Sequence, residues 1–426
     1  MQTSCTLELF IDQRWQSVAT ARLLGETRLG WRAAVRCDYS AAWTLAHFGR
    51  RDAYSVSTSW PVGLDGFASS HWPGFLVDLL PQGFGRQHLI QRLGYPSDPE
   101  GRVDWQLLCS GAGNPIGNLR VREAADWLSS QPRLERGFTD EDLSSLSEEF
   151  LEAAASTAFL AAGSSGVQGE WPKLLLTRAH DGLLYLDHEL PDHSAAEHFI
   201  VKLQLSSNAA RSTILQQEAV YSNIAQHLGL RVHKPAVHRG RALFIARFDR
   251  QVQGSLVHRL AQESVASLTQ RTGFEQLPSH NEVCAALVKY ASNPANEVTE
   301  YLLRDVANVA LGNKDNHARN TAIQRDALGG VRLTPLFDFA PMLIHPDGLA
   351  RRMRWNDEKQ GKPDWRLVVE QLSPLVDPRG LKNALQLMAP RLEEVMRHGL
   401  EMGLSPDLMP LLTPSLKTQL TAFEAL

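Results

Sequence analysis

The stretch LGNKDNHARN, residues 311–320, decides the fold and chemistry expected of this chain. It follows an apolar helical run that breaks at Gly312, so its polar side chains fall in a loop. Asp315 and Asn320 have the spacing at which, in phosphoryl transfer, a carboxylate accepts a proton and an amide oxygen holds a divalent cation. In a chain of this length about one such pair also arises by chance, and Asp315 alone could cap a helix.

A second acidic motif downstream strengthens the first. In LTPLFDF, residues 333–339, Asp338 stands between two phenylalanines at the end of an expected strand. A carboxylate in such apolar surroundings needs a partner, either a divalent cation or backbone N–H groups. Asp315, Asn320 and Asp338 together favour a metal-dependent catalytic site over separate structural uses.

Composition describes a soluble globular protein of two or three domains. The chain has 426 residues, of which 43% are hydrophobic and 21% charged, and its net charge of −4 excludes a general nucleic-acid-binding field. The N-terminus has no signal-peptide pattern, and no run of eighteen apolar residues occurs, so we expect a cytoplasmic protein without membrane contact. Four scattered cysteines without a CxxC motif are expected to be free thiols: Cys5, Cys37, Cys109 and Cys284.

The first part of the chain reads as a mixture of short strands and helices. Strands are expected near 5–11 and 54–57, and a helix interrupted at Pro81 over 75–94. Residues 105–121 suggest a helix end, a turn and a strand. A polar boundary follows, with a short helix starting at Thr139.

A Gly/Ser-rich segment then leads into a strand beginning near Lys173 and a hairpin at Asp181-Gly182. Glycine backbone of this kind can approach phosphate, although a plain loop has the same composition. The strand 198–205 carries Lys202 at its centre, either reaching a rim or paired inside a site. An amphipathic helix over 212–230, capped by Ser212 or Thr213, carries Glu218.

Two further strands, 231–238 and 242–250, are expected to meet at an Arg-Gly turn. From about 255 the pattern becomes helical, interrupted by a strand pair at 320–325 and 331–336. The order of glycine-rich hairpin, lysine strand, glutamate helix and two strands matches the small lobe of a protein kinase. We therefore predict an α+β, protein-kinase-like two-lobed fold with a β-rich N-lobe and a helical C-lobe. Its domains are an N-terminal α/β subdomain (1–135), the N-lobe (136–250) and the C-lobe (251–426).

The motifs GVQGEWPK, HFIVKLQ, QQEAVYSNIAQHLGL, ARFDR, GNKDNHARN and LTPLFDF resemble the HipA-like serine/threonine kinases, toxins of bacterial toxin–antitoxin systems. DLLPQGFGR and LLCSGAGNPIGNLRV resemble that family's N-terminal region, so the likeness covers roughly residues 70–390. The HRD and DFG motifs of ordinary protein kinases are absent.

The resemblance implies a role for each matching residue. Asp315 is the implied catalytic base, Asn320 and Asp338 the implied Mg²⁺ ligands, and Lys202 a phosphate contact with Glu218 as its partner. The remaining implied ATP-binding residues are Ser165, Gly166, Val167, Gln168, Lys173, Ala246, Arg247, Phe248 and His317. His317 is otherwise a structural histidine.

The chain departs from the family pattern in its ATP loop and hinge. Gly163 stands where the family's loop often has serine, leaving Ser165 or Ser164 as the autophosphorylation site or as ordinary loop formers. An inserted GEWP leaves the placement of Lys173 open, and Ala246 stands where the family often has an acidic residue.

Three functions remain open on sequence alone. The first is an ATP- and Mg²⁺-dependent serine/threonine protein kinase of the HipA toxin type. Its implied target is a translation protein such as an aminoacyl-tRNA synthetase, and its implied partner a HipB-like helix-turn-helix antitoxin that binds DNA. The second is a small-molecule phosphotransferase of the aminoglycoside or choline kinase type, and the third a non-catalytic nucleotide-binding partner of an antitoxin. Six basic residues within 345–366 either receive an acidic or RNA-bound substrate or belong to a solvated loop.

Overall fold

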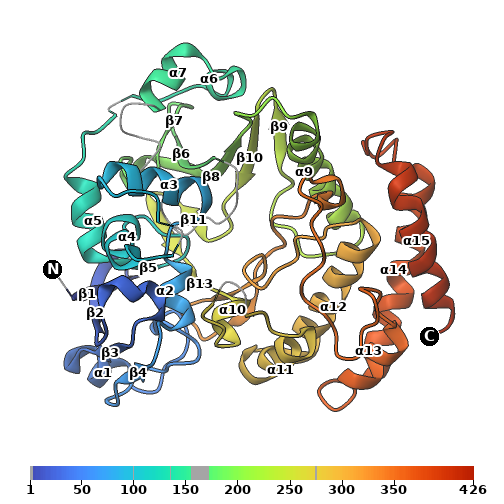
Figure 1. The fold of residues 1–426 in the computed structure, drawn as a ribbon, viewed down its shortest axis with the longest axis horizontal. Helices are drawn as coiled ribbons and strands as arrows, with labels where there is room; N and C mark the ends of the chain where they lie inside the picture. Colours follow the sequence, from blue (N-terminus) through green and yellow to red (C-terminus); the bar gives the residue numbers. More distant parts are fainter. Residues whose placement is uncertain (1–2, 99, 135, 155–171, 274–275) are drawn as a thin grey trace. The chain divides into compact units, whose positions relative to one another are not determined.

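The computed structural model describes residues 3–98, 100–134, 136–154, 172–273 and 276–426, which form two compact units (Figure 1). Unit 1 comprises Met1–Leu205, Arg239–Gln276 and Gln324–Gly330. Unit 2 comprises Ser206–His238, Leu277–Ile323 and Val331–Leu426. Of the helices described, none combines the length and apolar character needed to cross a membrane. The three-domain division stays a prediction.

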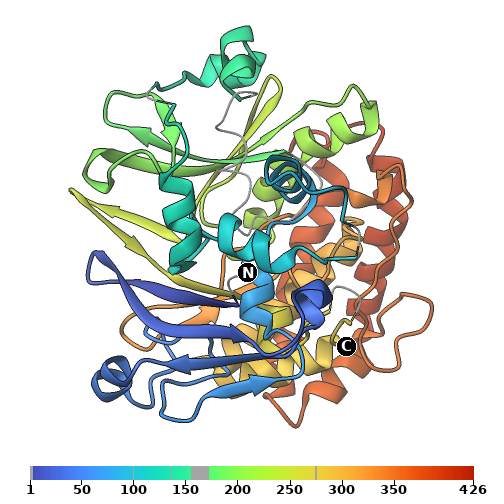
Figure 2. The same cartoon turned by 60° about the vertical axis from the view of Figure 1, so that its left-hand side comes forward.

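The N-terminal part of unit 1 is an antiparallel sheet with the strand order β4-β3-β2-β1-β5 (Figure 2). Strands β1 and β2 join through Asp12 and Gln13, whose positive φ angles of 52° and 63° suit a tight hairpin. The strands are β1 (Ser4–Ile11), β2 (Arg14–Leu23), β3 (Val35–Tyr39), β4 (Phe67–Ser69) and β5 (Leu119–Val121). The helices of this part are α1 (Ala41–His47), α2 (Gly74–Asp78), α3 (Gly83–Arg92), α4 (Asp104–Gly111) and α5 (Arg122–Ser129).

This part has its own hydrophobic core. Trp72 and Trp105 are buried and meet edge to face, with ring centroids 5.6 Å apart. The helix break at Pro81 is confirmed, because α2 ends before it and α3 begins after it. The strand predicted at 54–57 is wrong. That segment forms turns, and its polar groups are satisfied locally, as where the Ser55 hydroxyl donates to the Asp52 carbonyl oxygen at 3.0 Å.

A second sheet of unit 1 contains the adjacent strands β7, β6, β8 and β10, all antiparallel. Its strands are β6 (Lys173–Ala179), β7 (Leu184–Leu186), β8 (Ala195–Leu203) and β10 (Ala242–Ala246). Two short helices precede it, α6 (Asp140–Ser145) and α7 (Glu148–Ala153). Thr139 caps α6 in a capping box with Asp142, which confirms the predicted start. A separate apolar cluster joins these helices to the sheet, as at the edge-to-face pair Phe138–Phe150.

After β10 the chain forms β11 (Arg250–Gln253), β12 (Leu256–Arg259), β13 (Ala261–Ser264) and α10 (Val265–Leu268). Strands β11 and β12 pair as an antiparallel hairpin. The helical pattern expected from residue 255 is therefore wrong over 256–264. The expected strand at 231–238 shrinks to β9 (Val237–Arg239).

Unit 2 is built around helix α12 (Pro294–Ala310), which contacts α11, α14 and α15. The helices α14 and α15 lie side by side (Figure 1). The other elements are α9 (Ala209–His227), α11 (His280–Tyr290), β14 (Ala322–Arg325, which ends in unit 1), β15 (Val331–Leu333), α13 (Trp365–Leu372), α14 (Pro378–His398) and α15 (Met409–Glu424).

Helix α9 begins earlier than expected. Asn208 is its N-cap, and the Asn208 Oδ1 accepts from the Arg211 backbone N–H at 3.0 Å, so neither Ser212 nor Thr213 caps it. The helix ends as expected near Gly229, whose φ of 84° favours glycine.

Candidate functional site

The loop that follows α12 is held in one shape by its own polar side chains. Gly312 has a φ of 67°, which lets the chain leave the helix. The Asn313 backbone N–H and Nδ2 both donate to Asn308, to its carbonyl oxygen at 2.9 Å and its Oδ1 at 2.8 Å. The Asn320 Nδ2 donates to the Asp315 carbonyl oxygen at 2.8 Å. These contacts fix the two ends of the predicted motif against each other.

The Asp315 carboxylate is partly exposed, as a group that receives a substrate proton must be. Its side chain is 40% exposed, and its Oδ1 lies 4.0 Å from the His317 Nε2, beyond hydrogen-bond distance. The His317 Nδ1 accepts from the Arg319 backbone N–H at 3.2 Å, which leaves the proton of a neutral ring on Nε2. His317 therefore has a structural contact within the loop and stands beside Asp315.

Asp338 has an unusual backbone conformation for a residue other than glycine, with a φ of 51°. Aspartate tolerates the left-handed region better than most residues, and such strain is concentrated at functional sites. Asp338 is half-buried and follows β15.

Asn320 and Asp338 line the same small cavity in unit 2, about 10 Å³ in volume. Asn308 and Asn313 line it as well. A cavity of this size holds about one water molecule or one ion. Asp315 does not belong to its wall. The structure therefore brings together two of the three oxygen-bearing residues singled out from the sequence and places the third beside them through the Asn320–Asp315 hydrogen bond.

The wall of this cavity suits a divalent cation. The Asn313 Oδ1 is buried, and among the described residues it has no hydrogen-bond partner. Amide and carboxylate oxygens are the ligands that hard cations prefer, and Mg²⁺ usually adds several waters to one or two carboxylates. No group of three or more His, Cys, Asp or Glu side chains suited to a metal occurs in the described part of the chain. Sequence reasoning missed Asn313, although it lies two residues before Asp315.

Asp305 on α12 binds this loop through a hydrogen bond to Asn316. Its Oδ1 accepts from the Asn316 Nδ2 at 3.1 Å, and its Oδ2 accepts from the Trp355 Nε1 at 2.7 Å and from the Arg351 guanidinium. Burial alone raises the pKa of the Asp305 carboxyl, but the Arg351 guanidinium outweighs it and holds that pKa below its ordinary value. Arg351 also pairs with Glu358 and its side chain is 9% exposed, so this arginine is neither solvated nor presented to a substrate.

In unit 1, two lysines face each other across neighbouring strands. Lys173 on β6 and Lys202 on β8 are register partners, so their side chains project from the same face of the sheet. Lys173 is 7% and Lys202 4% exposed. Buried cations on facing positions concentrate positive charge and favour an anion such as phosphate. Lys173 therefore lies opposite Lys202 in the sheet.

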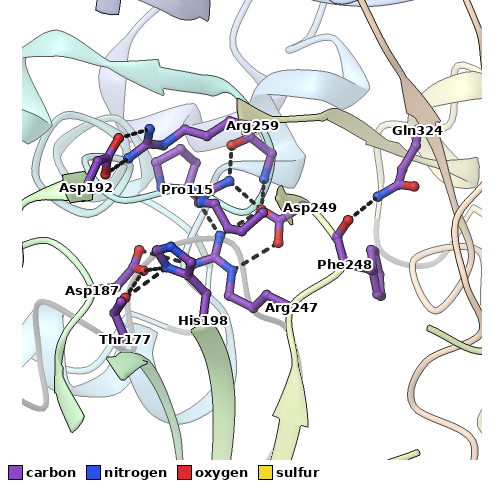
Figure 3. Close-up of polar contacts among 12 residues, drawn as sticks. Pro115, Thr177, Asp187, Asp192, His198, Arg247, Phe248, Asp249, Arg259 and Gln324 are labelled. Carbon is purple, nitrogen blue, oxygen red and sulfur yellow. Dashed lines mark hydrogen bonds and ion pairs between the residues drawn. The ribbon is translucent and has the colours of Figure 1, made fainter. Parts of the chain in front are cut away.

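The segment after β10 is fixed by a buried ionic network, drawn in Figure 3. The Arg247 Nη1 donates to the Asp187 Oδ2 at 3.0 Å, and its Nη2 donates to the Asp249 Oδ2 at 2.7 Å. Burial raises the pKa of the Asp249 carboxyl, but the guanidinium groups of Arg247 and Arg250 outweigh it and hold that pKa well below its usual range. The Arg247 side chain is thus occupied inside the protein, and a nucleotide contact at this residue would have to use backbone atoms.

The backbone of the same segment is also engaged. The Arg247 N–H donates to the His198 carbonyl oxygen at 2.8 Å, and the Phe248 carbonyl oxygen accepts from the Gln324 Nε2 at 3.2 Å (Figure 3). Ala246 ends β10 and is buried. The assignment of Ala246, Arg247 and Phe248 to adenine stays a prediction.

Several predicted residues are not settled by these contacts. Ser164, Ser165, Gly166, Val167 and Gln168 lie outside the described residues. Glu218 is buried on α9 of unit 2, whereas Lys202 belongs to unit 1, so their pairing stays a prediction. The four cysteines are free thiols, as predicted.

A β-rich unit with facing lysines and a helical unit with an Asp–Asn loop are the two parts of a protein-kinase-like α+β fold. Comparison with known proteins supports this class. The HipA-like C-terminal domain family matches residues 165–398. The protein named "Putative kinase Y4mE" from Sinorhizobium fredii (strain NBRC 101917 / NGR234) is 25% identical over 343 residues, covering 76% of each chain.

The fold is also that of a solved structure, HipA from Shewanella oneidensis MR-1 in complex with HipB and its operator DNA. The two chains superpose with a TM-score of 0.65 at 18% identity, covering 99% of this chain and 97% of the other. The chain therefore belongs to the HipA-like family, and the predicted kinase-like two-lobed α+β fold is confirmed.

Proposed function

We propose that this protein is an ATP- and Mg²⁺-dependent protein kinase that phosphorylates serine or threonine side chains. The observation that carries the proposal is the small cavity lined by Asn320, Asp338 and Asn313, whose Oδ1 has no hydrogen-bond partner among the described residues. Membership of the HipA-like family and the similarity to the protein named kinase Y4mE support it.

In the proposed reaction, the hydroxyl oxygen of the substrate attacks the γ-phosphorus of ATP while the bond from that phosphorus to the β–γ bridging oxygen breaks and ADP leaves. Asp315 accepts the hydroxyl proton. Lys173 and Lys202 bind phosphate oxygens. Asn320, Asp338 and Asn313 would hold Mg²⁺, which when bound neutralises charge on the transferred group.

The partner and the target are proposed on resemblance. The Shewanella HipA structure contains HipB and operator DNA, and we propose a HipB-like helix-turn-helix antitoxin for this chain, with DNA bound through that partner. We propose a translation protein, such as an aminoacyl-tRNA synthetase, as the phosphorylated target. Phosphorylation of Ser164 or Ser165 belongs to the same proposal.

The purified chain should be incubated with γ-labelled ATP, Mg²⁺ and a bacterial lysate, in parallel with Asp315→Asn and with excess chelator. The proposal expects labelled phosphoserine or phosphothreonine in protein with the wild type, and a loss of at least about 10²-fold in the variant. Label that enters only small hydroxyl compounds would favour a small-molecule phosphotransferase. Nucleotide binding without any transfer would favour a non-catalytic partner of an antitoxin.

A further inference from the structure

Unit 1 contains a second cavity that the proposed reaction does not use. Its volume is about 320 Å³, within the range of small-molecule pockets. Trp15 on β2, Arg120 on β5 and Asn114 line one part of it, and residues 187–192 after β7 line another. The cavity therefore lies between the N-terminal sheet and the β6–β8 sheet, both within unit 1.

Three side chains of its wall carry polar atoms with unused hydrogen-bonding capacity. The Asn114 Nδ2, the His188 Nδ1 and the Arg259 Nε are all buried, and none has a hydrogen-bond partner within the described ranges. Asn114 is only 8% exposed. Buried polar groups in native proteins are normally satisfied, so three on the wall of one cavity indicate a missing acceptor.

Burial lowers the pKa of the His188 imidazole to about 4, so the ring is neutral at physiological pH and its Nδ1 can carry the proton. All three atoms can then act as donors. The ligand that satisfies them is one rich in acceptor oxygens.

The charges of the wall favour the same kind of ligand, because its acidic groups are already engaged. Asp187 accepts from Arg247 and from the His198 Nδ1, Asp192 accepts from both Nη atoms of Arg259, and the Glu189 Oε1 accepts from the Leu134 N–H. Two further arginines line the cavity, Arg120, which pairs with Glu8 at 2.8 Å, and Arg133. Arg133 is exposed and donates to the Glu189 carbonyl oxygen at 2.8 Å.

We propose that this cavity binds a small molecule bearing a carboxylate or phosphate group, whose oxygens accept from Asn114, His188 and Arg259. The site is separate from the lysines assigned to ATP. His198, which contacts the cavity residue Asp187, lies four positions before Lys202 on β8, roughly 13 Å along the strand. Asp187 also accepts a hydrogen bond from the Arg247 guanidinium, and this contact connects the cavity wall to the segment after β10 (Figure 3).

The test is calorimetric titration of the full chain with succinate and, separately, with inorganic phosphate, in the presence of Mg²⁺ and a saturating non-hydrolysable ATP analogue, after subtraction of the same titrations without protein. We expect saturable one-to-one binding of at least one probe. Asn114→Asp, which replaces the amide donor by a carboxylate of the same shape, should weaken it at least tenfold. The matched change Asn223→Asp, on the exposed side of α9, should leave it unaltered.

Arg133→Gln provides a second variant at an exposed position that should fold normally, and it should weaken binding severalfold. Lys202→Met distinguishes this cavity from the proposed ATP site, and it should leave probe binding unchanged. The proposal would be overturned if neither probe binds. It would also be overturned if Asn114→Asp and Arg133→Gln leave binding unaffected, or if Lys202→Met abolishes it. None of these results depends on whether the chain transfers phosphate.

Discussion

Lys173 and Lys202 occupy facing positions on the antiparallel strands β6 and β8, and both are buried. Facing like charges cost stability, of order 0.2–1 kcal/mol at a sheet surface. Because the chain keeps this pair, we propose that the combined positive charge binds an anion, namely an ATP phosphate.

Replacing either lysine should therefore separate activity from stability. We expect Lys202→Met to lower kcat/KM for ATP by at least about 10²-fold, as removal of one preorganised donor does elsewhere. The free energy of unfolding without nucleotide should change much less than the activation free energy, because methionine keeps the apolar stem of the lysine side chain. Steady-state kinetics and urea unfolding measure the two quantities, with Lys202→Arg as the charge-preserving control. Normal kinetics in a destabilised Lys202→Met protein would show that the lysine is structural.

Asn313 should control the requirement for metal. Asn313→Ala removes the amide oxygen without a partner, and we expect the Mg²⁺ concentration for half-maximal activity to rise at least tenfold. Asn223→Ala, at an exposed position of α9, is the matched control. The measurement is activity as a function of Mg²⁺ concentration at saturating ATP, and coincident curves for wild type and Asn313→Ala would remove Asn313 from the metal site.

Asp305 should hold the loop 311–320 in place through Asn316. Asp305→Asn leaves the buried Arg351 guanidinium with Glu358 as its remaining ion-pair partner, and we expect a loss of about 2–3 kcal/mol in the free energy of unfolding. Trp355→Phe removes the 2.7 Å hydrogen bond to the Asp305 Oδ2 together with part of the buried indole ring, and it should cost about 2 kcal/mol. Urea unfolding compares the two. Equal small losses would mean that the Arg351 pairing contributes little.

The buried His280 should make the protein less stable in mild acid. Burial lowers its pKa to about 4 from an ordinary value of 6.5, and its Nε2 lies 3.1 Å from the Arg351 Nη2. The folded protein binds this proton less readily than the unfolded chain. The contribution of the neutral His280 ring to the free energy of unfolding is therefore complete above about pH 6.5 and is lost as the pH falls toward 4. It amounts to about 3 kcal/mol at most.

The measurement is the free energy of unfolding at pH 5 and at pH 7.5 for wild type and His280→Gln. We expect the pH dependence to be shallower in the variant, since glutamine does not titrate. An identical pH dependence in both proteins would assign the acid sensitivity to other groups.

Gly312 should tolerate no side chain. A Cβ at this position would lie 2.3 Å from the Leu343 Cδ2, and the φ of 67° is itself unfavourable for alanine. Gly348→Ala is the matched control, because its φ is 63° and its surroundings are open. We expect Gly348→Ala to cost about 1–2 kcal/mol and Gly312→Ala clearly more, measured by thermal unfolding. Equal costs would show that Leu343 moves aside freely.

The sequence predicted those parts of the protein whose signals are local. The capping box at Thr139, the glycine stop at Gly229 and the break at Pro81 each follow from the chemistry of one or two residues. The order of strands and helix around Lys202 was sufficient to predict the kinase-like class.

The parts that failed depend on partners distant in the chain. Strand β11 (RQVQ) is mostly polar and has no alternating apolar face, so only its pairing with β12 defines it. The Arg247 guanidinium is bound by Asp187, sixty positions away, and no periodicity indicates that contact. Asn313 becomes a candidate metal ligand only because Asp338, which follows β15 in the chain, lines the same cavity.

The central claim is that Asp338 and Asn320 hold a metal ion bound to ATP. The most direct measurement is a crystal structure of the chain grown with Mg²⁺ and a non-hydrolysable ATP analogue. The account predicts a metal within about 2.0–2.1 Å of oxygens from both Asp338 and Asn320, coordinated to the phosphates. A nucleotide bound with its metal held by other residues, or with the cavity filled by water alone, would contradict it.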